Sequence, residues 1–150
     1  GIFLKPLTAL GVRAIGVDPS VNVSKIANDA GLTTIVAFFD SPTAQKIKNE
    51  YGAPDVVVAS SIFTHLEDPH SFIEAVKEVM APRGVFIIEV EYIGNILRDV
   101  QFERFYLDRI FYYSLSSLKE LFARHDMHVC DAEEIVPHGG SLRVSAYRRG

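Results

Sequence analysis

Residues 12–19 read VRAIGVDP, a strand-length apolar run that ends at an aspartate and a proline. Helical spacing resumes over residues 23–30 and stops at Gly31, so the stretch opens a strand–helix unit. Further strands are expected over residues 33–39, 55–59 and 85–90, and further helices over residues 41–52, with Ser41 as N-cap, and 72–80. Strands that alternate with helices through short connections predict an α/β fold with a parallel, doubly wound, Rossmann-like sheet.

The two ends of the chain depart from this alternation. A short helix is expected over residues 4–10, and a helix over residues 115–124 that is capped by Ser114. Two closing strands, residues 128–136 and 142–147, predict an antiparallel hairpin at one edge of the sheet. We interpret residues 1–150 as one partial domain, and we expect the first, central strand of the sheet to be absent from this chain.

Composition narrows the classes of function. With 15 basic and 19 acidic residues the net charge is −4, which argues against a nucleic-acid partner. The apolar runs are only strand-length, so no membrane-spanning segment is expected. A lone Cys130 and scattered histidines give no disulfide and no metal-ligand spacing. We therefore expect a soluble, cytoplasmic protein without a metal site in these residues.

Candidate cofactor residues follow the first two expected strands. Asp18 stands where a doubly wound sheet binds nucleotides, and its carboxylate can accept both ribose hydroxyls or, with equal weight, cap the helix after Pro19. Gly1 would matter as the end of a glycine-rich turn. Phe38 and Phe39 offer a face for an adenine ring, although such a pair is more often core, and we expect at most one to touch a ligand.

Polar residues also follow the strand at residues 55–59. Ser60 and Ser61 are expected at the carboxyl edge, where the transferred group and its acceptor meet. His65 can exchange a proton near neutral pH, but a lone histidine is more often structural. On the next strand we expect Glu89 and Glu91, on either side of Val90, to point to opposite faces of the sheet, so that only one of them faces a pocket.

Residues 101–113, rich in aromatic and charged side chains, are expected to form a functional loop or a short helix. Tyr106, Asp108 and Arg109 could hydrogen-bond a hydroxylated or phosphorylated acceptor, since arginine binds such groups in a bidentate way. The alternative is a solvated ion pair. His138 adds a histidine on a turn whose glycines could simply shape the hairpin.

Taken together, these segments resemble the S-adenosylmethionine-dependent C-methyltransferases that act on nucleotide-linked keto-deoxysugars. The matching stretches are Gly1 to Leu7, Gly16 to Pro19, Phe38-Phe39, His65 to Asp68, Tyr106 to Leu118 and His138 to Val144. The resemblance implies S-adenosylmethionine as methyl donor, with Gly1 ending the cofactor-binding glycine motif and Asp18 on the ribose. It also implies a cysteine-rich zinc-binding domain and a further C-terminal domain elsewhere in the full protein.

The chain departs from this family at the expected base. Methylation of carbon needs a base beside the ketone, usually the second histidine of a Tyr-His-Glu-His motif. Here the motif reads Tyr106-Leu107-Asp108-Arg109, and an arginine stays protonated in proteins. Either His65 or His138 takes over this role, or the acceptor is a hydroxyl or an amine.

Three hypotheses follow for the function. The first is transfer of a methyl group from S-adenosylmethionine to a small acceptor, with a nucleotide-linked sugar as a candidate. The second is a fragment of an NAD-dependent dehydrogenase, because an acidic residue after the second strand serves either cofactor. The third is a degenerate or truncated module without catalysis. The missing strand leads us to expect poor cofactor binding by this stretch alone.

Overall fold

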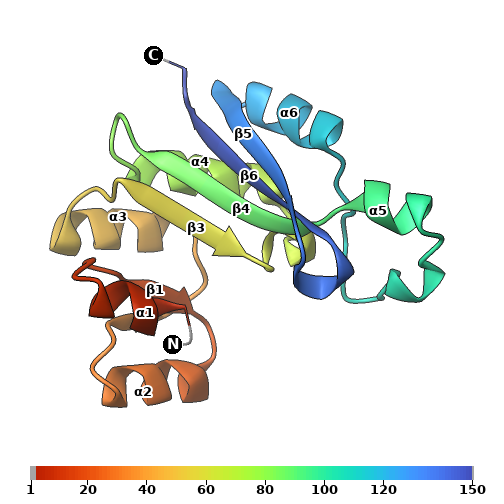
Figure 1. Ribbon diagram of the computed structural model, residues 1–150. Helices are drawn as coiled ribbons and strands as arrows, with labels where there is room; N and C mark the ends of the chain where they lie inside the picture. Colours follow the sequence, from red (N-terminus) through yellow and green to blue (C-terminus); the bar gives the residue numbers. More distant parts are fainter. Residues whose placement is uncertain (1–2, 150) are drawn as a thin grey trace. The chain divides into compact units, whose positions relative to one another are not determined.

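The computed structural model describes residues 3–149, apart from the side chain of His138 (Figure 1). The chain divides into two compact units, residues 1–43 and 44–150. We describe each unit by itself.

The first unit is a small strand–helix–strand arrangement that follows helix α1 (Leu4–Ala9). Strands β1 (Gly16–Asp18) and β2 (Thr34–Val36) pair in parallel, and α2 (Val21–Asp29) connects them. The Asn28 side chain donates to the carbonyl of Thr34 at 2.9 Å and accepts from its amide at 2.8 Å. These bonds fix the end of α2 beside the start of β2.

Both strands of this unit are shorter than predicted. Residues 12–15 and 37–39 lie outside the ladder, which runs only from the Gly16–Thr34 pair to the Asp18–Val36 pair. Among the described strands, β1 and β2 pair only with each other. A strand ends where its backbone pairing ends, so the apolar residues beyond these three pairs do not lengthen it.

The second unit is built on a four-stranded mixed sheet in the order β3-β4-β6-β5 (Figure 1). Its strands are β3 (Val56–Ser60), β4 (Val85–Glu91), β5 (Met127–Ile135) and β6 (Ser141–Arg148). β3 and β4 are parallel, whereas β6 runs antiparallel to both β4 and β5. The predicted terminal hairpin is therefore confirmed, with β5 at the edge. A bulge at Cys130 shifts the register of β5.

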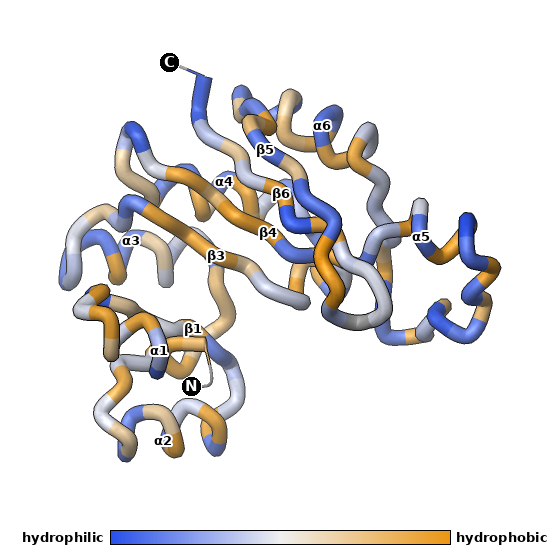
Figure 2. Tube along the Cα trace, in the orientation of Figure 1, coloured by the Kyte–Doolittle hydropathy of each residue, from blue (hydrophilic) through white to orange (hydrophobic). Residues whose placement is uncertain are grey.

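The core of this unit lies on the face of the sheet that packs against the helices. Figure 2 shows how apolar the two parallel strands are, and inward-facing Phe86, Ile88 and Val90 of β4 are fully buried. Phe63 and Phe122 pack with Phe86 at ring distances of 6.3 and 5.9 Å. The helices of the rest of the chain are α3 (Ser41–Tyr51), α4 (Pro69–Val79), α5 (Ile93–Arg98) and α6 (Leu115–Ala123).

Two local details of the helices differ from the sequence prediction. Asp40 rather than Ser41 caps α3, because the Asp40 carboxylate accepts from the Thr43 amide at 2.9 Å. Helix α5 was not predicted, since residues 93–98 carry neither a capping residue nor a clear period. Ser114 caps α6 as predicted, in a reciprocal capping box with Ser117.

The described strands do not form one continuous sheet. β1 and β2 make one sheet, and the other four strands make another. The expectation that a further strand belongs between the strands ending near Asp18 and Ala59 stays a prediction. No helix in the described part of the chain has the length and apolarity to cross a membrane.

Candidate functional site

Asp18 stands at the carboxyl end of β1, where its side chain is half-exposed. Its Oδ1 accepts a hydrogen bond from the Ser20 amide at 2.8 Å, and its main-chain carbonyl accepts from the Ser24 hydroxyl at 3.1 Å. Ser20, not Asp18, is the cap of α2. The carboxylate thus supports the turn with one oxygen, and a carboxylate has further acceptor sites for a ligand.

The aromatic pair lies just beyond β2 in the same unit. Phe38 is 76% exposed, whereas Phe39 is half-buried. The Thr43 hydroxyl donates to the Phe38 carbonyl at 2.9 Å and so anchors the backbone under the exposed ring. A carboxylate and a bare aromatic face after neighbouring parallel strands fit the ribose and the adenine of an adenosyl group. Pro19 is exposed, and Gly1 lies outside the described residues.

Ser60 and Ser61 end β3 in the second unit. The Ser60 hydroxyl donates to Oε2 of Glu89 at 2.6 Å, and the Ser61 amide donates to the Glu89 carbonyl at 3.1 Å. Ser61 has a φ of 59°, an uncommon conformation for a residue other than glycine. Arg143 pairs with the same Glu89 carboxylate at 2.8 Å. These contacts hold the loop after β3 against the neighbouring strands.

The expectation for Glu89 and Glu91 was wrong. Residues two apart in a strand project from the same face, so the two carboxylates do not diverge. They differ instead in their partners, because Glu91 is buried and bound by two arginines of the loop after α5.

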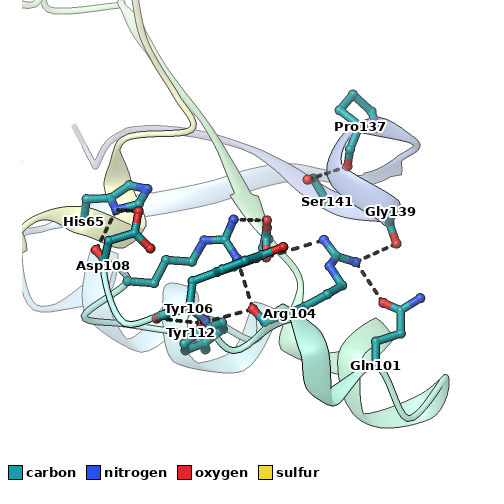
Figure 3. A network of polar contacts seen from close by, with 11 residues as sticks. His65, Gln101, Arg104, Tyr106, Asp108, Tyr112, Pro137, Gly139 and Ser141 are labelled. Atoms are coloured by element: carbon teal, nitrogen blue, oxygen red, sulfur yellow. Dashed lines mark hydrogen bonds and ion pairs between the residues drawn. The ribbon is translucent and has the colours of Figure 1, made fainter.

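Arg109 forms an ion pair with Glu91, and the two side chains are 14% and 7% exposed. Figure 3 labels Arg104 and Tyr106, which also contact Arg109. Arg109 also donates to the carbonyl of Arg104 at 3.1 Å. The alternative of a solvated ion pair is therefore wrong for Arg109, because its partner is Glu91 and both side chains are largely buried. The residue in the position of the family's base serves here to hold the loop to the end of β4.

Arg104 is a second buried arginine, and sequence analysis did not single it out. Its Nη2 lies 3.4 Å from Glu91 Oε2, and its Nη1 donates to the carbonyl of Gly139 at 2.7 Å and to Gln101 at 2.9 Å (Figure 3). Gly139 has a φ of 73°, which strains residues other than glycine, and a Cβ there would lie 2.9 Å from Arg104 Nη1. The sequence pointed to Arg104 only as one charged residue within an aromatic segment, which does not predict a buried ion pair.

Two tyrosines complete the loop. The Arg109 guanidinium lies over the ring of Tyr106, 4.5 Å from its centroid. The Tyr112 hydroxyl accepts from the Tyr106 amide at 2.7 Å and donates to the Arg104 carbonyl at 3.2 Å. Tyr106 is about half-exposed. Its ring is thus positioned by the ion-pair network while one side stays open.

His65 lies beside the same loop, on the short 3₁₀ turn Phe63–His65. Its Nδ1 is 2.7 Å from the main-chain carbonyl of Asp108 and 3.8 Å from the Asp108 carboxylate (Figure 3). Because a carbonyl oxygen only accepts, Nδ1 carries the proton and neutral His65 has its lone pair on Nε2. The side chain is 38% exposed, so Nε2 is available as a proton acceptor.

The structure brings four of the predicted residues together. His65, Tyr106, Asp108 and Arg109 form one contiguous network in the second unit. Asp18, Phe38 and Phe39 belong to the first unit, which is described separately. The side chain of His138 lies outside the described part of the structure. Within the described residues, no group of three or more histidine, cysteine or acidic side chains is arranged to hold a metal ion.

Comparison with known proteins identifies the family of this chain. Residues 1–131 match a family described as a methyltransferase domain. C-methyltransferase NovU of Streptomyces niveus is 35% identical over 146 residues, which cover 97% of this chain and 35% of that protein. The ubiquinone biosynthesis O-methyltransferase of Bartonella tribocorum is 25% identical over 91 residues, covering 59% of this chain and 36% of that protein. The chain thus spans about a third of the length of these relatives.

Solved structures share the fold at low sequence identity. A complex of the Haloferax volcanii Trm112 methyltransferase activator with a methyltransferase contains a chain with a TM-score of 0.73 and 19% identity, matched over 99% of this chain and 79% of that one. Magnesium protoporphyrin IX methyltransferase of Synechocystis PCC 6803, with bound S-adenosylhomocysteine, gives a TM-score of 0.70 at 13% identity over 96% of this chain and 68% of that one. The predicted α/β, Rossmann-like methyltransferase fold is confirmed.

Proposed function

The chain belongs to the methyltransferase-domain family, and we propose that it forms part of an S-adenosylmethionine-dependent enzyme that methylates a small molecule. The observation that carries this proposal is the family match over residues 1–131, joined by 35% identity to a C-methyltransferase along nearly the whole chain. Nothing in these comparisons supports the dehydrogenase alternative.

For the methyl donor, we assign the ribose hydroxyls to Asp18 and the adenine ring to Phe38. Asp18 retains acceptor capacity beyond its bond to Ser20, and the Phe38 ring is largely exposed. Pro19 and Phe39 follow the strands of the first unit, whereas Ser60 and Ser61 lie at the end of β3 in the second. These four residues and the backbone of Gly1 stay predicted contacts of the cofactor. When bound, S-adenosylmethionine supplies the electrophilic methyl group on its sulfonium.

For the acceptor, we propose a keto sugar linked to a nucleotide, methylated at carbon. Its support is the similarity to the C-methyltransferase relative and the exposed polar and aromatic side chains of the loop. Arg109 is committed to Glu91 and stays charged, so it is not the base. We assign that role to His65, with His138 as the alternative.

Proton removal by His65 follows from its hydrogen bond. Nε2 takes the proton next to the ketone, while Nδ1–H stays on the Asp108 carbonyl. The Asp108 carboxylate, 3.8 Å from Nδ1, stabilises the resulting imidazolium. Tyr106, held by Arg109, offers its hydroxyl at the same side of the loop.

Calorimetric titration of the intact protein with S-adenosylhomocysteine tests the donor site. We expect Asp18→Asn to weaken binding by about 10- to 100-fold, since two charge-assisted hydrogen bonds to the ribose are reduced. Asp29→Asn is the matched control, because Asp29 is an exposed carboxylate of the same unit that pairs with Lys25. NAD should not bind. Equal affinity in the wild type and Asp18→Asn would refute the assignment, and saturable binding of NAD alone would refute the function.

A further inference from the structure

Three hydrogen-bonded side chains, which we call the histidine–glutamate triad, join α4 to the residue that follows α6. His70 and Glu74 lie one turn apart on α4, and His125 follows α6. His125 Nδ1 is 2.5 Å from Glu74 Oε1, and His125 Nε2 is 2.7 Å from His70 Nδ1. His125 is 8% exposed, whereas His70 is exposed. The triad thus links the carboxylate of Glu74 through the buried ring of His125 to the exposed ring of His70.

The carboxylate determines where the protons lie. An ionised Glu74 only accepts, so His125 Nδ1 carries a proton. Neutral His125 then has its lone pair on Nε2, which accepts from His70 Nδ1–H. Neutral His70 is left with its lone pair on Nε2. The outer ring therefore presents a hydrogen-bond acceptor of fixed tautomer.

His70 lines a pocket of about 350 Å³ formed by the start of α4, residues 111–113 and α6. This volume falls in the range of small-molecule sites, roughly 300–1,000 Å³. Phe111, Tyr113 and Leu121 give much of its wall an apolar, aromatic character. Tyr113 is 6% exposed, and its hydroxyl has no hydrogen-bond partner among the described residues. The pocket therefore combines an aromatic surface with an unsatisfied polar atom beside it.

The side chains around the pocket carry a net negative charge, which disfavours the binding of an anionic ligand. Glu67 and Asp68 border it without a cationic partner among the described residues, while Glu120 and Arg124 pair with each other at 3.1 Å. A carboxylate or phosphate on a ligand would meet net negative charge here. A ligand that donates a hydrogen bond and carries no negative charge is favoured.

We propose that this pocket binds a neutral aromatic molecule that carries a hydroxyl group, a phenol, whose O–H donates to His70 Nε2. The ring of the ligand packs against Phe111 and Tyr113, and its oxygen lies at the polar end of the pocket. Glu74, through His125, fixes His70 as the acceptor. The proposal does not depend on methyl transfer, and its test uses binding alone.

The test compares matched probes on the intact wild-type protein by calorimetry at pH 7.5. We expect 4-methylphenol to bind about tenfold more tightly than 4-methylanisole, which has the same ring but no hydroxyl proton. The anion 4-hydroxybenzoate should bind more weakly than 4-methylphenol. Absence of saturable binding by 4-methylphenol, or equal affinity for the phenol and its methyl ether, overturns the proposal.

Two variants locate the acceptor. His70→Phe should abolish the preference for 4-methylphenol over 4-methylanisole, and Glu74→Gln should reduce it by removing the charge that orders the protons. His128→Phe is the matched control, because His128 is an exposed histidine on β5 that packs on Tyr147 and does not line the pocket. The preference should persist in this control. If the preference persists unchanged in both His70→Phe and Glu74→Gln, the triad does not provide the hydrogen-bond acceptor for the phenol.

Discussion

At the scale of single residues, Arg109 has a structural role, because it forms an ion pair with Glu91. In the C-methyltransferases that the sequence resembles, a histidine base is expected where this chain has Arg109, which here forms a largely buried ion pair with Glu91 at the end of β4. A group so paired and always charged holds structure and does not move protons. In the proposed function another side chain therefore removes the proton from the acceptor. We assign this step to His65, whose ring contacts the loop.

Replacing His65 tests its role as base. His65→Asn keeps a donor for the Asp108 carbonyl but removes the proton acceptor, so we expect kcat to fall by about 10²- to 10⁴-fold. Binding of S-adenosylhomocysteine should not change. His128→Asn, on β5, serves as control and should retain full activity. An active His65→Asn enzyme would shift the assignment to His138.

Replacing Arg109 tests the buried pair. Arg109→Met leaves Glu91 with Arg104 as its remaining cation, and we expect a loss of about 3 kcal/mol in the free energy of unfolding, measured by urea denaturation. Adding Glu91→Met should not recover the loss, because the buried Arg104 then loses its carboxylate partner. Arg98→Met, at an exposed pair with Asp99, should change stability by less than about 1 kcal/mol. A single variant as stable as the wild type would contradict this account.

At the scale of elements, sequence reasoning succeeded where composition and period agree. The valine-rich β3 and the alternating β4 were placed within a residue or two, and the capped helix α6 was found from Ser114. β1 was overextended because its length depends on pairing, which no local pattern contains. Contacts such as Arg104 with Gly139 join residues 35 apart in the chain, so the sequence alone gave no sign of them.

The α4–α6 link carries a pH dependence that belongs to this scale. The hydrogen bond from His125 lowers the pKa of Glu74 below its ordinary value of 4.5. A carboxyl whose pKa is depressed by folding stabilises the fold above its unfolded pKa, and this contribution disappears as the pH falls through the folded pKa. Urea denaturation should therefore show a wild-type advantage over Glu74→Gln near pH 7 that shrinks below about pH 4.5. Glu50→Gln on α3 is the control, and a constant advantage down to pH 3 would contradict the prediction.

At the scale of the whole molecule, the two units divide the proposed work. The first unit contains the carboxylate and the aromatic ring assigned to the donor, and the second contains the loop and the histidine assigned to the acceptor. The fold class was predictable because alternation of strands and helices repeats along the chain. The polar network of the second unit was not, because His65 and the loop that contains Tyr106 and Arg109 are distant in the sequence and meet only through tertiary packing.

The bulge at Cys130 has a consequence for how this protein behaves at high concentration. An outermost strand with a regular backbone is a template on which another polypeptide can stack and begin an aggregate. The extra residue in β5 interrupts that template and increases its local twist, so a foreign strand finds no continuous row of donors and acceptors. The irregularity thus helps to keep molecules of this protein apart.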